Sequence, residues 1–124
     1  MTSREFLSEL LSAADHQTEE DLPYIAVTEP GDKVFRALLA GHSADPFFAV
    51  VERVFAEGDA EAQNLCVVGL FESLQGRNYR EGDADLVERN LGPLSQAAWA
   101  DLIEGWTGAG YRTVAQWRAK PPKP

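Results

Sequence analysis

Hydrophobic positions recur three and four residues apart along most of the chain, which is the spacing of one buried face of an α-helix. The first such segment follows Thr2-Ser3-Arg4-Glu5, which has the pattern of a capping box, so a helix is expected to begin there. Its predicted inward face comprises Phe6, Leu7, Leu10, Leu11 and Ala14.

The helical spacing is lost between residues 15 and 30, where Glu29-Pro30-Gly31 forms a strong turn signal. A surface loop with a short extended piece at 24–27 is therefore predicted. A second helix is expected over 32–40, and Gly41 is placed to end it.

The middle of the chain predicts a helical hairpin. Asp45 suits an N-cap and Pro46 suits the first helical position, so a helix is expected over about 45–57, ended by Gly58. A second helix over about 60–75 follows almost at once, so the two are expected to pack antiparallel.

The second helix of this hairpin is the most apolar of the chain. Its apolar residues cover an arc of roughly 200° at about 100° per residue, so we expect a central position. Asn64 falls inside this arc, and its amide is expected to be buried and satisfied by neighbouring backbone rather than by a ligand.

Three further helices complete the prediction. Asp83 is expected to cap a short helix, and a longer helix from about Ser95 has four inward positions: Trp99, Leu102, Ile103 and Trp106. A last short helix is expected through Val114 and Trp117. No segment alternates with period two over more than a few residues. The sequence thus predicts an all-α compact bundle of about six helices over residues 1–119, followed by a disordered Pro/Lys tail at 120–124.

Charge narrows the classes of partner. The 124 residues include 20 acidic and 11 basic side chains, giving a net charge of −9, so nucleic acid and anionic membrane surfaces are not expected as partners. The single cysteine, Cys66, excludes a disulfide within the chain and a zinc site built on several cysteines. With no signal-peptide pattern and no long apolar run, a cytoplasmic protein is expected.

Candidate catalytic chemistry is sparse. The chain has two histidines, His16 and His42, and none of the glycine-rich phosphate-binding or nucleophile-elbow motifs. Cys66 lies in an apolar run, where an unreactive protonated thiol is expected. We therefore expect no enzyme activity, no cofactor and no metal. A metal- or ligand-binding bundle around His42, Glu52 and Glu72 is the weakest alternative, because no Glu-x-x-His pair is present.

One stretch of the hairpin resembles a known class of domain. The motifs are Glu57-Gly58-Asp59, then Glu61 to Leu65, then Phe71-Glu72-Ser73-Leu74. They resemble small bacterial all-helical domains of unknown function found in toxin–immunity loci. The resemblance implies a non-enzymatic immunity protein that binds and neutralises a cognate toxin or effector.

An acidic inhibitor of this kind gains electrostatic complementarity against a toxin that is basic at its active site. The candidate partner-binding residues are therefore acidic and placed in loops or near helix ends: Glu19, Glu20, Asp21, Glu57, Asp59, Glu61, Glu81, Asp83 and Asp85. A small regulatory or scaffold module without a toxin partner is the alternative, and an exposed apolar groove between helices would favour it.

Overall fold

The computed structural model describes residues 1–120, and every regular element within them is helical. The elements in chain order are α1 (Ser3–Ala13), α2 (Pro23–Ala26), α3 (Thr28–Leu39), α4 (Asp45–Glu57), α5 (Ala60–Asn64), the π-helix η1 (Leu65–Phe71), α6 (Glu72–Arg80), the 3₁₀-helix η2 (Glu88–Asn90), α7 (Pro93–Thr107) and α8 (Val114–Arg118). The predicted all-α bundle is confirmed. Of the predicted disordered tail, 121–124 lie outside the described residues, whereas the Lys120 ammonium lies 5.4 Å from the ring centre of Tyr79.

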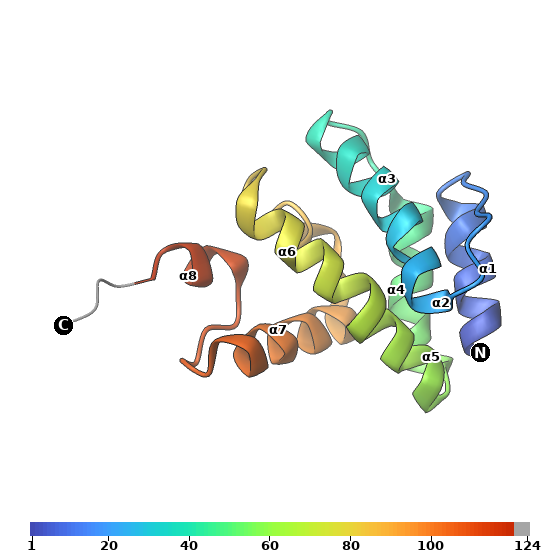
Figure 1. Cartoon of the computed structure of the whole chain (residues 1–124). Helices are drawn as coiled ribbons and strands as arrows, with labels where there is room; N and C mark the ends of the chain where they lie inside the picture. The colour runs from blue at the N-terminus through green and yellow to red at the C-terminus, as the bar shows by residue number, and fades with distance from the viewer. Residues whose placement is uncertain (121–124) are drawn as a thin grey trace.

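Helices α5, η1 and α6 form one continuous helical rod through the middle of the molecule (Figure 1). It begins where predicted, because Gly58 ends α4 and the Asp59 side chain accepts a hydrogen bond from the Ala62 N–H at 2.8 Å. The rod then runs back past α4 in the opposite general direction, so the two form the expected hairpin (Figure 1). Their aromatic side chains meet at Phe55 and Phe71, whose ring centres are 5.7 Å apart.

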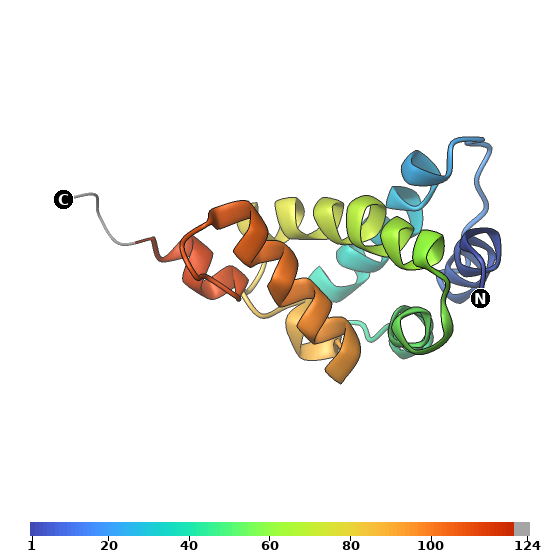
Figure 2. The same cartoon turned by 90° about the horizontal axis from the view of Figure 1, so that it is seen from below.

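The other helices pack around this hairpin. Seen from below, α7 crosses beneath the rod, α4 is viewed end-on, and α8 lies at the far end of the molecule from α1 (Figure 2). The predicted capping box of α1 is present, with Thr2 and Glu5 each accepting a backbone hydrogen bond at 3.2 Å. The core between these helices is aromatic at its centre, and its largest fully buried side chains are Trp99, Phe6, Phe35, Phe47 and Phe71.

The segment before α3 differs from the prediction. The extended piece expected at 24–27 is wrong, because Pro23–Ala26 form the short helix α2 with Pro23 in its first turn. Helix α3 begins at Thr28, four residues earlier than expected. Pro30 is tolerated there because the N–H groups of a first helical turn have no partner within the helix.

Four other local predictions are wrong. Asp45 is the first residue of α4 rather than its cap, since Ala44 precedes the helix and makes no side-chain capping bond. The rod continues to Arg80 instead of ending near residue 75. The helix expected after Asp83 is reduced to η2. Trp106, expected in the core, is 57% exposed.

Candidate protein-binding surface

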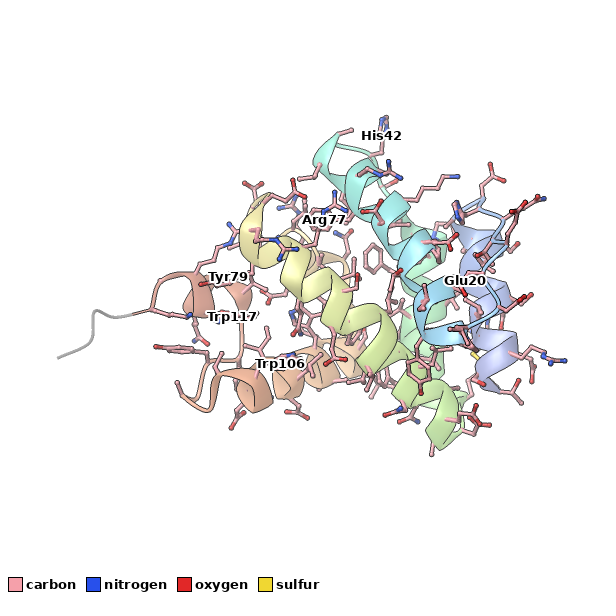
Figure 3. The ribbon with its side chains drawn as sticks, viewed as in Figure 1. Glu20, His42, Arg77, Tyr79, Trp106 and Trp117 are labelled. Atoms are coloured by element: carbon pink, nitrogen blue, oxygen red, sulfur yellow. The ribbon has the colours of Figure 1, made fainter. Side chains whose placement is uncertain are left out.

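The nine predicted contact residues form three clusters. The first acidic cluster, Glu19, Glu20 and Asp21, lies in the connection between α1 and α2, where Figure 3 places Glu20 beside α2. The second acidic cluster, Glu57, Asp59 and Glu61, lies at the junction of α4 and α5. The third acidic cluster, Glu81, Asp83 and Asp85, follows the end of α6.

The third cluster is largely neutralised by arginines of the same chain. Glu81 is paired with Arg77, and Arg89 lies 3.0 Å from an Asp85 oxygen and 3.7 Å from an Asp83 oxygen. Its surface potential is therefore weaker than its three carboxylates alone would give.

The second cluster is partly neutralised. Glu57 pairs with Arg53 at 3.0 Å, Asp59 caps α5, and Glu61 accepts a hydrogen bond from the Ser3 hydroxyl at 3.1 Å. Asp59 and Glu61 thus keep their charge without a cationic partner among the described residues.

The first cluster has no cationic partner among residues 1–120. Glu20 accepts a hydrogen bond from the Leu22 N–H at 3.1 Å, and no lysine or arginine pairs with Glu19, Glu20 or Asp21 in this part of the chain. It is therefore the cluster whose negative charge is most available to a partner.

The clusters do not share one surface. The second and third clusters lie at opposite ends of the rod, and the 20 residues from Glu61 to Glu81 span roughly 30 Å at helical rise. The first cluster lies toward the α5 end, since α2 packs on η1 and Tyr24 contacts Asn64 (Figure 1). The structure thus brings the first two clusters to one side of the molecule and leaves the third apart.

Four exposed apolar side chains lie at α2 and on η1, close to the first acidic cluster, and are here called the apolar face. It consists of Leu22, Tyr24, Ile25 and Val68, whose side chains are 59%, 40%, 50% and 44% exposed. Tyr24 lies against η1 near Gly69 and Asn64, so the exposed side chains gather on two packed segments. Grouped exposed apolar side chains are typical of interaction sites.

The apolar face is held in place by the contact of α2 with η1. A methyl group at Gly69 would lie 2.6 Å from Val27 Cγ1, so only glycine allows the two segments to approach this closely. The Asn64 side-chain amide also donates a 2.7 Å hydrogen bond to the Tyr24 hydroxyl. Asn64 is exposed, so the prediction of a buried amide is wrong.

Asn64 also forms part of a neighbouring pocket, here called the α4–α7 groove, of about 520 Å³. Its lining residues are Phe55, Ala60, Gln63, Asn64, Val67, Ala98, Asp101 and Leu102. The polar side chains already have partners within the chain: Gln63 donates to the Gly58 carbonyl, Asn64 to Tyr24, and Asp101 accepts from Arg112. The groove therefore offers mainly apolar contact.

The π-helix η1 begins directly after Asn64 and contains Val68, and both side chains lie on the surface. With i→i+5 hydrogen bonds, each residue rotates through a smaller angle about the helix axis than in an α-helix. Residues that α-helical spacing would place in the core therefore point in other directions. Val68 then joins the apolar face and Val67 lines the groove. The apolar spacing of the sequence carries no signal for this change.

A second, polar pocket of about 660 Å³ lies beside the first acidic cluster. It is lined by His16, Gln17, Thr18, Glu19, Glu20 and Glu29. Hydrogen bonds from His16 and from the Thr18 hydroxyl, both 3.0 Å long, lower the pKa of Glu29. These contacts fold the connection between α1 and α2 back onto α3, and so position the first acidic cluster.

The residues of the metal-site alternative are not gathered into one pocket. His42 lies at the end of α3 in a small pocket that contains neither Glu52 nor Glu72 (Figure 3). Burial tends to raise the pKa of Glu52, but hydrogen bonds from Ser95 and Leu94 outweigh it and lower that pKa. Glu52 thereby caps the start of α7.

Two further features bear on function. Across residues 1–120, no three His, Cys, Asp or Glu side chains lie close enough together to hold a metal ion. Cys66 is buried in the core, and burial raises its pKa well above the usual thiol value, so the sulfur is held protonated.

Within the same residues, no helix combines the length and apolar character needed to cross a membrane.

Comparison with known proteins gives one match. A family model described as a domain of unknown function (DUF7674) matches residues 3–107. No curated protein and no solved structure matches the chain. The matched range runs from α1 to the end of α7, so it includes all three acidic clusters, the apolar face and the groove.

Proposed function

The chain belongs to the DUF7674 family, a domain of unknown function, and we propose that it is a non-catalytic protein that binds and neutralises a cognate bacterial toxin or effector through an acidic surface. The proposed partner is a protein that is basic at its active site and is met in the cytoplasm. Nucleic acid and membranes are not proposed as partners, and no cofactor or metal is part of the mechanism.

The observation that carries this proposal is the first acidic cluster next to the apolar face. Its three carboxylates have no cationic partner in residues 1–120, and they adjoin Leu22, Tyr24 and Ile25, which are exposed. A protein interface commonly combines an apolar centre with a polar rim. The unpaired charges would steer a basic partner to the apolar residues that then hold it.

To neutralise a toxin, such a protein needs only to cover the toxin's active site. An interface of about 1,600 Å² in total, with roughly half contributed by each partner, is enough for a stable complex. An inhibitor bound over a basic active site excludes the substrate by volume and by charge, so the chain itself needs no catalytic group.

The proposal is tested by capture and neutralisation. The tagged full chain is used to capture proteins from its host lysate at low and at high salt, and each retained protein is then expressed with and without the chain. The proposal requires a stoichiometric partner that arrests growth alone and is harmless when the chain is co-expressed. A partner whose expression alone leaves growth unchanged would contradict it.

The α4–α7 groove favours a second candidate, a regulatory or scaffold module that binds a helix of a non-toxic protein. Both candidates use protein binding, so affinity alone does not separate them. The effect of the captured partner on growth, and the effect of the chain on the partner's activity, do separate them.

A further inference from the structure

We propose that the apolar face and the α4–α7 groove form one docking surface, and that its occupant is a basic amphipathic helix of the partner protein. This inference rests on the proposed protein-binding function and adds to it the surface and the chemistry of the partner segment. It assigns no role in docking to the third acidic cluster.

The two parts of the surface are continuous at the π-helix. Asn64 lines the groove and donates to Tyr24 of the apolar face, while Val67 and Val68 are consecutive residues that belong to the groove and the face respectively. On the other wall, Ala98, Leu102 and Trp106 are spaced four residues apart, so they share one side of α7. Apolar side chains therefore extend from α2 across η1 to the end of α7.

The character of the groove favours a helix over a small polar ligand. Small-molecule sites commonly place a few unpaired polar groups around an apolar pocket. Here the Gln63, Asn64 and Asp101 side chains each have a hydrogen-bond partner in the chain. The rest of the lining is apolar and comes from α4, the rod and α7: Phe55, Ala60, Val67, Ala98 and Leu102. This lining suits apolar anchors one helical turn apart.

Charge complementarity identifies the helix as basic. The first acidic cluster lies at the α2 side of the surface, and Asp59 and Glu61 lie where α5 begins beside the groove. None of these five carboxylates has a lysine or arginine partner in the described part of the chain. Lysine or arginine side chains flanking an apolar stripe would meet carboxylates at the α2 side and at the start of α5.

The test uses the whole chain and three synthetic probes of about 18 residues, which span roughly 27 Å as helices. The first peptide has leucines at positions i, i+3, i+4 and i+7 with lysines elsewhere. The second has the same leucines with glutamates, and the third has the composition of the first without the amphipathic spacing. Binding is measured by titration calorimetry, and the site is mapped by amide chemical shifts in NMR.

Two matched pairs of variants accompany the probes. Leu22→Ser/Ile25→Ser removes apolar side chains of the face, and Leu39→Ser/Leu94→Ser removes somewhat less exposed ones elsewhere. Glu19→Gln/Asp21→Asn removes two charges of the first cluster, and Asp83→Asn/Asp85→Asn removes two from the third. All eight side chains are exposed, so each variant is expected to fold.

The inference requires saturable one-to-one binding of the lysine peptide, with shifts at residues 22–25, 60–68 and 98–106. Binding should weaken about tenfold in Leu22→Ser/Ile25→Ser and in Glu19→Gln/Asp21→Asn, and less than about twofold in the control variant of each. Equal binding of the glutamate or unpatterned peptide, shifts at other residues, no binding, or a homodimer that buries the face would each overturn it. The peptide assay does not depend on toxicity, so the neutralisation proposal can fail while this inference stands, and the reverse.

Discussion

The Tyr24 hydroxyl accepts a 2.7 Å hydrogen bond from the side-chain amide of Asn64, a residue 40 positions later in the chain. This bond ties the four-residue helix α2 to the rod at the point where the α-helical turn becomes a π-helical turn. A helix as short as α2 is not stable by its own backbone bonds. Its position depends on contacts of this kind, and so does the apolar face that it carries.

Removing this hydrogen bond should loosen α2 without unfolding the protein. Tyr24→Phe keeps the ring and loses the acceptor, so the free energy of unfolding should fall by no more than about 1 kcal/mol, because the pair is exposed. Amide hydrogen exchange in residues 23–27 should nevertheless become faster. Tyr79→Phe is the control, and equal exchange of residues 23–27 in both variants would contradict the role given to Tyr24.

Two glycines of the rod should respond in opposite ways to the same substitution. A methyl group at Gly69 meets Val27, whereas one at Gly76 meets nothing within 4 Å. Gly69→Ala should lower the free energy of unfolding by about 1–3 kcal/mol through overpacking. Gly76→Ala should raise it by up to about 1 kcal/mol, because alanine favours a helix over glycine. Urea unfolding measures both, and a neutral Gly69→Ala would show that α2 does not pack closely on η1.

Glu52 should make stability depend on pH. Its carboxylate accepts hydrogen bonds from the Leu94 N–H, the Ser95 N–H and the Ser95 hydroxyl at 2.7–2.9 Å. These bonds lower the pKa of Glu52 in the folded state, so its contribution is present above the unfolded value of about 4.3 and is lost as pH falls through the folded pKa.

Glu52→Gln should therefore lower the free energy of unfolding by about 1–2 kcal/mol at pH 7, the usual effect of losing a charged helix cap. The difference from the unmodified protein should shrink as the pH approaches 3. Denaturant titrations at several pH values measure it, with Glu72→Gln as the control. A difference that stays constant with pH would contradict the capping role.

Glu88 should prove important for the packing of Trp99 and for the position of Val114 at the start of α8. It is buried, and one of its oxygens accepts hydrogen bonds from the Trp99 indole N–H at 2.8 Å and the Val114 N–H at 2.9 Å. Glu88→Ala leaves two buried donors without partners and should lower the free energy of unfolding by about 2–4 kcal/mol. Near-ultraviolet circular dichroism should show altered tryptophan packing, whereas an unchanged spectrum and stability would contradict this assignment.

Much of the fold follows from local signals that are strong in the sequence. The capping box of Thr2 and Glu5, the stop at Gly58 and the cap at Asp59 were all predictable, because each depends on residues adjacent in the chain. Gly41, with φ 85°, also ends α3 as expected. The all-α class followed from these signals and from the helical spacing of apolar residues.

The wrong predictions concern segments whose structure depends on contacts between residues far apart in the chain. Glu29-Pro30-Gly31 suits a turn, but Gly31 lies in α3 directly against Leu70, and that close packing draws the segment into the helix. The apolar positions of 65–71 fit an α-helix or a π-helix equally well, so the exposure of Val68 could not be predicted. The apolar face could not be predicted either, because it depends on the packing of α2, with Leu22, Tyr24 and Ile25, against η1.

The candidate site was predicted in part. The first acidic cluster could be identified from composition, but its lack of a cationic partner in the described residues depends on where Arg53, Arg77 and Arg89 fold. The same arginines neutralise much of the third cluster and one carboxylate of the second, Glu57. Sequence therefore identified the charged residues, and tertiary structure distinguishes among them.

Whether the apolar face and its flanking carboxylates bind a protein can be measured by hydrogen–deuterium exchange on the chain alone and in complex with its captured partner. We predict slower exchange in residues 22–28 and 60–70 on binding, with residues 81–91 unchanged. Protection confined to residues 81–91, with α2 and η1 exchanging as in the free chain, would contradict it.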